Sequence, residues 1–399
     1  MSTNWTSYGL PCVVRGLALA TVALTAPLYA QPTPPRPTTP RPLVAAPSAS
    51  PAVHPDGSVD FKLQMPNAKE VTLSIEGFPT PFPMAKDAAG AWTYTAPHLD
   101  PEYYSYTIHV DGTDVVDPHN QTVKTSFFRV ENVFLVPGDK PWELRDVPHG
   151  VVHRHHYRST LVNAESEYYV YTPPGFSAAS KQTYPVLYLL HGYSDDASAW
   201  TAMAKANVIL DNLIAAGKAK PMIVVMPTGY GSMEMITRGW AAWQDASLVR
   251  LNFSRFGEAL YQEVMPRVKK EYSLAADRDQ HAIAGLSMGG AESLLVGLNH
   301  PDDFAYVAGF SAGGLGDRNF ELIFPGITEA TGAGLSKRLK LLWISCGSED
   351  GLLAPNQKLI AWLKERKVEP KVVVTPGMHV WPVWRDNLSN LLPLLFQAK

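Results

Sequence analysis

The chain has 399 residues, of which 46% are hydrophobic and 18% are charged. This composition can bury a large core, and the length is typical of about two domains. The formal net charge of −3 gives no indication of a polyanionic partner, so we expect no nucleic acid to bind. With only two cysteines, Cys12 and Cys346, a disulfide framework and a cysteine-ligated zinc site are also excluded.

Residues 1–30 have the layout of a bacterial signal peptide. Arg15 precedes an apolar run from Gly16 to Ala26, and Ala30 is a small residue before a cleavage position. The run is short for a membrane span, although a membrane anchor is the alternative. We therefore expect cleavage after Ala30 and a secreted or periplasmic protein that is not held at a membrane.

Residues 31–54 are rich in proline, threonine and serine, which predicts a semi-extended linker. Residues 55–140 differ, because short runs of alternating apolar and polar residues are separated by glycine-containing turns. Val71–Ile75 and Tyr103–Val110 are two such runs. This pattern predicts a small β-sandwich.

The aromatic residues of this predicted sandwich allow two interpretations. Trp92, Tyr103 or Tyr104 could form a carbohydrate-binding platform. Alternatively, the sandwich is a packing domain that shapes the neighbouring catalytic cleft. We favour the packing domain, because aromatic residues that alternate along a strand usually point into a core.

Strands and helices alternate from about residue 150 to residue 399, which predicts a mostly parallel eight-stranded sheet covered by helices. Val186–Leu190 and Met222–Met226 are continuous apolar runs, as expected of strands that are buried on both faces. An early cluster of three histidines, His153, His155 and His156, does not predict a metal site. On a strand the first two share a face, the third points away, and no nearby carboxylate completes a ligand set.

A short stretch within this region predicts a catalytic serine. Ala282–Ala284 is an apolar strand, residues 285–289 (GLSMG) fit the G-x-S-x-G pattern, and a helix is expected to follow. In this strand–turn–helix setting the serine, Ser287, occupies a strained turn that exposes its hydroxyl. Side chains at Gly285 or Gly289 would collide with a neighbouring strand or helix. The backbone N–H of Met288 would then face the oxygen that becomes negative when Ser287 attacks a carbonyl.

The acid and the histidine of a catalytic triad follow in the expected order, Ser–Asp/Glu–His. Glu349 and Asp350 both come directly after a predicted strand, and His379 comes after the next one. His379 would accept the Ser287 proton, and the acid would orient the imidazole and stabilise its cation. The N–H of Tyr193, just past the His191–Gly192 turn, is the second candidate oxyanion donor.

The mostly parallel eight-stranded sheet and the strand–turn–helix around Ser287 predict an α/β-hydrolase fold for residues 150–399. Several segments of this region resemble a known family. LYLLHGYSDDASAW, HAIAGLSMGGAES, LLWISCGSEDGL and GMHVWPVW are similar to esterase D-type hydrolases, specifically the feruloyl esterases of carbohydrate esterase family one. Segments such as MPNAKEVTLSIEG and GAWTYTAP resemble the immunoglobulin-like early-set domain that precedes some bacterial members. The resemblance implies a Ser287–His379–Asp350 triad, with Asp350 rather than Glu349 as the acid, and the Tyr193 and Met288 N–H groups as the oxyanion hole.

The same resemblance implies a secreted serine esterase that hydrolyses feruloyl esters of plant xylan, without cofactor or metal, acting on feruloylated arabinoxylan or related fragments. Trp200 and Trp381 are the aromatic residues that we expect at its substrate-binding site. Acetylxylan esterases and enterochelin-type siderophore esterases are the alternatives on the same fold. A glycan-binding protein without activity is a further alternative, and the intact set of Ser, Asp and His argues against it.

Overall fold

The computed structural model describes residues 50–315 and 319–397. The predicted signal peptide and most of the predicted linker, residues 1–49, lie outside the described residues. None of the helices in the described ranges has both the length and the apolar character that crossing a bilayer requires.

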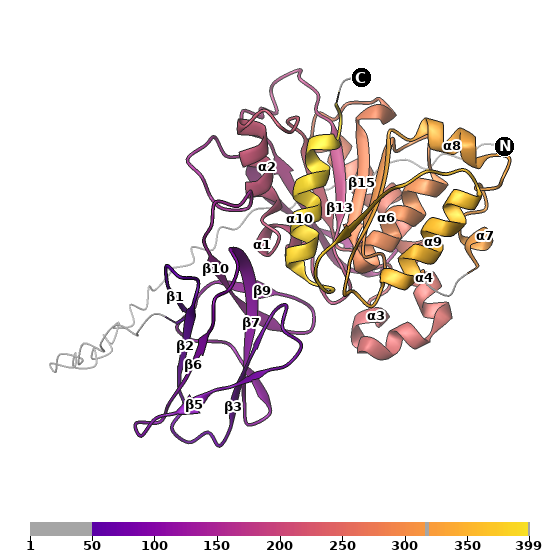
Figure 1. Ribbon diagram of the computed structural model, residues 1–399. Coiled ribbons are helices and arrows are strands. Elements are labelled where there is room, and N and C mark those ends of the chain that lie inside the picture. Colours follow the sequence, from indigo (N-terminus) through magenta and orange to yellow (C-terminus); the bar gives the residue numbers. More distant parts are fainter. Residues whose placement is uncertain (1–49, 316–318, 398–399) are drawn as a thin grey trace, which may run out of the picture. The chain divides into compact units, whose positions relative to one another are not determined.

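The N-terminal region consists of two antiparallel sheets (Figure 1). The first contains, in spatial order, β1 (Ala52–Val53), β2 (Val59–Gln64), β6 (Ala91–Ala96) and β5 (Ala85–Lys86). The second contains β4 (Phe82–Pro83), β3 (Val71–Ile75), β7 (Glu102–Val110), β10 (Val130–Val136) and β9 (Val123–Thr125), with β8 (Thr113–Val115) paired to β7. Alternate residues of both sheets, among them Phe61, Leu73 and Ile108, share one core. The predicted sandwich is thus present, while its assignment as an immunoglobulin-like domain stays a prediction.

The C-terminal region is built on the predicted eight-stranded sheet, in the order β11-β12-β14-β13-β15-β16-β17-β18. Its strands are β11 (Val151–Ser159), β12 (Ala164–Thr172), β13 (Val186–Leu190), β14 (Ile223–Pro227), β15 (His281–Leu286), β16 (Tyr306–Phe310), β17 (Leu341–Gly347) and β18 (Lys371–Thr375). β12 runs antiparallel to its neighbours β11 and β14, and the remaining pairs are parallel. The boundary predicted between residues 140 and 150 falls in the segment that joins β10 to β11.

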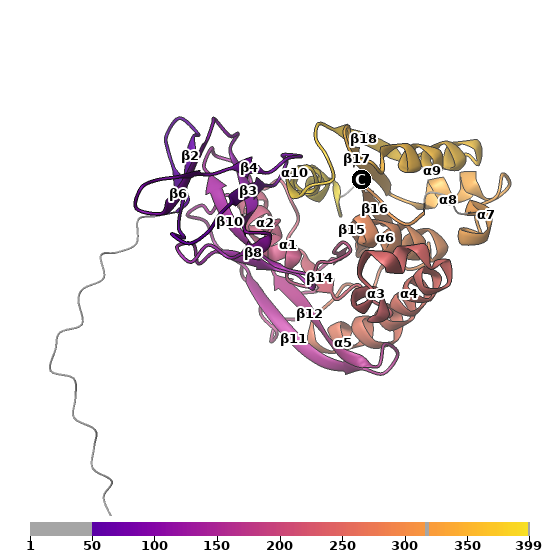
Figure 2. The same ribbon diagram turned by 90° about the horizontal axis from the view of Figure 1, so that it is seen from below.

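Helices cover both faces of this sheet (Figures 1 and 2). They are α1 (Ala199–Ala202), α2 (Ala206–Ala215), α3 (Glu234–Thr237), α4 (Ala246–Ala259), α5 (Met265–Glu271), α6 (Ser287–Asn299), α7 (Phe320–Ile323), α8 (Gly332–Arg338), α9 (Leu353–Glu365) and α10 (Trp381–Leu391). Leu187 and Leu189 of β13 pack toward the side of α1, α2 and α10. Val186 and Tyr188 pack toward the side of α4, α6 and α9. This alternation confirms the predicted α/β-hydrolase fold, because the central strands β13 to β17 are buried on both faces.

One predicted helix differs in its course. The sequence pattern predicts a single helix over residues 254–270, whereas α4 already begins at Ala246 and a π-helical turn, Leu260–Val264, separates it from α5. Asp245 explains the earlier start, because its carboxylate accepts the backbone N–H of Leu248 (3.1 Å) and so caps the helix. Pro266 has no N–H to donate to the preceding turn, which favours the widened turn before it.

Candidate active site

Ser287 lies in a strained turn at the junction of β15 and α6. Its φ angle is +51°, a left-handed conformation that non-glycine residues seldom adopt. A Cβ atom at Gly285 would lie 2.3 Å from the carbonyl oxygen of Gly289, and one at Gly289 would lie 2.4 Å from that of His191. Both positions therefore require glycine, for the steric reason that the sequence pattern indicates.

The structure brings Ser287, His379 and Asp350 together from the loops after β15, β18 and β17. The Ser287 hydroxyl donates to His379 Nε2 (3.0 Å), and His379 Nδ1 donates to Asp350 Oδ2 (2.8 Å). The Asp350 side chain is 1% exposed and also accepts the N–H of Leu352 (2.8 Å). Glu349, the alternative acid, is exposed.

The pKa of Asp350 is lowered from its usual value by its hydrogen bonds. Burial acts in the opposite direction and would raise this pKa, but the hydrogen bond and the charge of His379, together with the Leu352 N–H, outweigh it. Asp350 therefore stays ionised beside the imidazole. A carboxylate in this place favours the imidazolium that forms when His379 takes a proton.

The two residues with the predicted oxyanion donors both adjoin Ser287. Met288 follows it at the start of α6, and Tyr193 follows Gly192, where a Cβ atom would lie 3.3 Å from the Cβ of Ser287. The Tyr193 hydroxyl oxygen lies 2.7 Å from the carbonyl oxygen of Met235 and 2.6 Å from that of Gly239, which share its single proton. This side chain is therefore fixed, and it helps to hold its backbone beside the nucleophile.

Ser287, Asp350 and His379 line a cleft of about 800 Å³ whose remaining walls are partly aromatic. Tyr193 lines the cleft, and its ring centroid lies 4.9 Å from that of Trp240 and 5.3 Å from that of Trp243. Trp240 is 70% exposed, so most of its surface is open to solvent beside the cleft. Both tryptophans belong to residues 239–243 (GWAAW), so two aromatic residues close together in the sequence are the signal for this wall of the cleft.

The N-terminal region supplies a second wall of this cleft, although the sequence pattern did not indicate which of its residues form that wall. The lining residues from that region include Glu76, Phe78, Lys124, Arg129 and Glu131. The predicted platform residues are placed differently: Trp92 and Tyr104 belong to the sandwich core, and Tyr103 packs beside the core of the catalytic sheet. These placements agree with the interpretation of the N-terminal region as a packing domain that shapes the cleft.

The two tryptophans expected to bind substrate occupy different places. Trp381 lines the cleft, where its ring centroid lies 5.4 Å from that of Trp384, and the Trp384 ring in turn packs edge-on against His379. Trp200 is 0% exposed and packs behind Trp381 and Phe310. The prediction that Trp200 contacts substrate is therefore corrected: a fully buried ring supports the wall of the cleft from behind.

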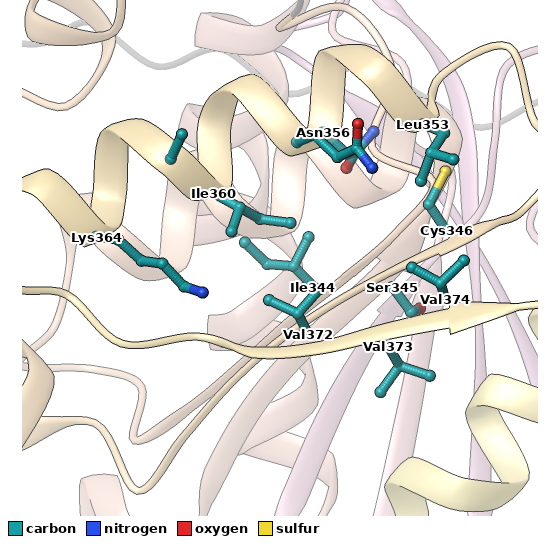
Figure 3. Close-up of a pocket in the computed structure, with 12 residues that line it drawn as sticks. Ile344, Ser345, Cys346, Leu353, Asn356, Ile360, Lys364, Val372, Val373 and Val374 are labelled. Atoms are coloured by element: carbon teal, nitrogen blue, oxygen red, sulfur yellow. The ribbon is translucent and has the colours of Figure 1, made fainter.

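Two other features lie apart from this cleft. A smaller cavity of about 270 Å³ between α9 and strands β17 and β18 is lined mainly by apolar residues such as Ile344, Ile360 and Val372 (Figure 3), and no member of the triad lines it. Within residues 50–315 and 319–397 no group of three or more His, Cys, Asp or Glu side chains could hold a metal ion. His155 instead shares a hydrogen bond with the Tyr272 hydroxyl (2.6 Å).

The fold and the site together define an α/β-hydrolase whose nucleophile elbow carries a Ser–His–Asp arrangement. The sequence model of the Esterase family matches residues 159–315. Over 355 residues the chain is 29% identical to the endo-1,4-beta-xylanase/feruloyl esterase of Xylanibacter ruminicola, a match that covers 87% of this chain and 46% of that protein. The chain thus spans less than half the length of this relative.

Solved structures agree with this assignment. The feruloyl esterase module of Clostridium thermocellum, complexed with sinapinate, is 25% identical with a TM-score of 0.52 and covers 65% of this chain and 92% of its own. The enterobactin esterase of Shigella flexneri in the presence of enterobactin has a TM-score of 0.62 at 19% identity, covering 84% of this chain and 92% of its own, and this likeness concerns the fold alone. The chain is an α/β-hydrolase that is similar to the Esterase family over residues 159–315 and related to the feruloyl esterases of carbohydrate esterase family one.

Proposed function

We propose that the chain is a secreted serine esterase that releases hydroxycinnamates such as ferulate from esters on plant xylan. The observation that carries this proposal is the Ser287–His379–Asp350 chain of hydrogen bonds, at 3.0 and 2.8 Å, inside a cleft with aromatic walls. An aromatic acyl group or a sugar ring can pack against such walls. The similarity to a xylanase/feruloyl esterase supports the substrate class, and the signal-like residues 1–30 support secretion.

The geometry supports a two-step acyl transfer. Ser287 Oγ attacks the ester carbonyl carbon as its proton passes to His379 Nε2, and the negative charge on the carbonyl oxygen is met by the N–H groups of Tyr193 and Met288. When the ester C–O bond breaks, the alcohol leaves with the proton from His379 and the acyl group stays on Ser287. A water molecule then attacks the acyl-enzyme, giving its proton to His379, and Ser287 recovers a proton as the free acid departs.

The test measures product release by residues 31–399 and by the same protein with Ser287→Ala. The substrates are methyl ferulate, a feruloylated arabinoxylan oligosaccharide, acetylated xylan and a catecholate siderophore ester. We expect ferulate release whose kcat falls by about four to six orders of magnitude in Ser287→Ala, because the nucleophile is lost while the binding surface remains.

Each alternative outcome has a distinct meaning. Activity on acetylated xylan alone, or on the siderophore ester alone, would replace the proposed substrate by the corresponding alternative and keep the mechanism. Activity that persists in Ser287→Ala at the level of the unmodified protein would contradict the mechanism itself.

A further inference from the structure

The hairpin of β9 and β10 holds the loop that carries Tyr193. We call residues 192–196 the Tyr193 loop. The backbone N–H of Phe127, between the two strands, donates to the carbonyl oxygen of Ser194 (2.8 Å), and Thr125 Oγ1 donates to Asp196 Oδ2 (2.8 Å). Ser194 has a φ of +74°, an unfavourable conformation for a residue with a side chain, which persists only when its surroundings hold it.

The most direct link between the hairpin and the Tyr193 loop is a buried ion pair. Lys124 Nζ lies 2.7 Å from Asp195 Oδ1, and the two side chains are 8% and 7% exposed. Glu131, which faces Lys124 across the hairpin, has Oε2 3.5 Å from the same Nζ. Burial alone would lower the pKa of Lys124, but the charges of Asp195 and Glu131 outweigh it and raise the pKa, so the side chain stays an ammonium ion.

A buried ion pair adds little to stability compared with an apolar pair of the same volume, because both charges lose their hydration. It does fix two groups at one distance and in one direction. Asp195 is two residues beyond Tyr193, so a shift of its carboxylate shifts the Tyr193 backbone. A donor to an oxyanion must lie within about 3 Å of that atom, and a misplacement of about 1 Å can cost about 100-fold in rate.

We propose that Lys124 is a positioning residue: by holding Asp195, it keeps the Tyr193 N–H aimed at the oxyanion of the transition state. This inference rests on the proposed esterase function. It gives the N-terminal sheets a part in catalysis, because a lysine of β9 determines the geometry of a donor that follows β13. Lys124 acts through Asp195 and contributes no proton or bond to the reaction.

The test compares Lys124→Met with the control Lys86→Met. Lys86 lies in β5 and donates to the carbonyl oxygens of Pro66 (2.7 Å) and Ala68 (2.9 Å), so the control also removes a bonded lysine from the N-terminal region. With methyl ferulate we expect kcat to fall about 10- to 100-fold in Lys124→Met and KM to stay within about twofold, because the lost contact matters only in the transition state. The control should keep both constants.

A purely structural role predicts a different pattern. It would lower the unfolding temperature of Lys124→Met and leave kcat unchanged when measured well below that temperature. An unchanged kcat in the folded variant would therefore overturn the proposal.

A second variant covers the case in which Lys124→Met does not fold, because that substitution leaves Asp195 buried without its partner. The combination of Lys124→Met and Asp195→Asn removes both charges and should fold. We expect the kcat of this double variant to fall about 10- to 100-fold, the loss expected for Lys124→Met alone. Both substitutions break the same link, so their effects do not add. A kcat equal to that of the unmodified protein in this double variant would contradict the proposed role.

A serine-directed phosphonate separates failure of this inference from failure of the proposed function. In the labelling step Ser287 Oγ bonds to phosphorus, the leaving group departs and the hydroxyl proton passes to His379. If the unmodified protein neither takes the label nor cleaves any ester, the proposed function is wrong. If it does both and the Lys124 variants match its rates, the inference alone is wrong. Slower labelling in the Lys124 variants supports the inference, because the phosphonyl oxygen occupies the oxyanion position.

Discussion

Glu292 is a buried acidic residue of α6, the helix that begins at Ser287, and it has no role in the proposed mechanism. Neither carboxyl oxygen has a hydrogen-bond partner among the described residues. A Cβ atom at Gly229 would lie 3.3 Å from its Oε2 and 3.5 Å from His191 Nε2, so the carboxyl group sits behind the turn that leads to Tyr193. Burial raises the pKa of Glu292 well above its usual value, and the group is held as the neutral acid.

We predict that Glu292→Gln makes the free energy of unfolding less dependent on pH. The folded pKa is above the ordinary value of 4.5, so from about pH 4.5 upward the unfolded chain releases this proton and the folded chain keeps it. Stability is then lost as pH rises, by about 1.4 kcal/mol per pH unit until the folded pKa is reached. Glutamine has no such proton. In urea unfolding at pH 5 and pH 8, the advantage of Glu292→Gln should grow with pH, and an equal difference at both values would contradict this account.

For single residues, the sequence predicted those features that depend on neighbours along the chain. The turn around Ser287 could be recognised because its strand, its G-x-S-x-G pattern and its helix follow one another directly in the sequence, and a Cβ atom at Gly285 would meet the nearby backbone of Gly289. The choice between Glu349 and Asp350 could not be made from spacing, since it depends on which carboxylate the loop after β17 turns inward. The same limit applies to Trp200, because a position near an active-site loop does not reveal whether the ring faces the cleft or the core.

At the scale of elements, Glu263 links two segments that are far apart in sequence. It lies in the π-helical turn between α4 and α5 and accepts hydrogen bonds from the turn that joins β11 to β12. The donors are Ser159 Oγ (2.6 Å), Thr160 N and Oγ1 (both 2.8 Å) and Leu161 N (3.3 Å). Burial acts to raise the pKa of Glu263, but these hydrogen bonds outweigh it and lower the pKa.

We predict that Glu263→Gln destabilises the fold by about 1–3 kcal/mol at pH 7, because the amide N–H₂ would face donors that then lack an acceptor. The folded pKa lies below the ordinary value, so this contribution is present above about pH 4.5 and is lost as pH falls through the folded pKa. Urea unfolding at pH 7 gives the loss. The kcat for methyl ferulate should not change, since Glu263 is not among the residues that line the cleft; a lower kcat would show that the turn also supports the site.

The elements that the sequence did not predict are those whose place depends on distant partners. β9 and β10 were not predicted, and their importance comes from Lys124 meeting Asp195, 71 residues further along the chain. Helix α10 begins at Trp381. The backbone N–H of Trp381 donates to Glu76 Oε1 (2.8 Å), and this acceptor comes from the N-terminal region, so no local sequence pattern can reveal it. The helix ends at Leu391, and Pro393 lies in the short 3₁₀ turn that follows it.

At the scale of the whole molecule, the two sheet regions share buried contacts as well as a cleft. Val133 of β10 and Trp142 belong to the same hydrophobic core as Trp200 and Leu388. Arg385 of α10 is 0% exposed. Its guanidinium donates to Glu102 of β7 and to the carbonyl oxygen of Met203 (2.7 Å). The N-terminal region therefore neutralises a charge that lies inside the catalytic region.

We predict that residues 150–399 expressed alone are less stable than residues 31–399 and have a lower kcat. Removal of the N-terminal region exposes the apolar surface of the shared core against which Val133 and Trp142 pack, and it also takes Lys124 from Asp195. Thermal unfolding and methyl ferulate hydrolysis measure both effects. Arg385→Met provides a check on the contact between the two regions. It should destabilise residues 31–399, where it leaves Glu102 unpaired, and have little effect on residues 150–399, where Arg385 no longer faces Glu102, Tyr103 or Trp142. Equal destabilisation of both proteins by Arg385→Met, or equal stability of the two unmodified proteins, would contradict this role of the N-terminal sheets.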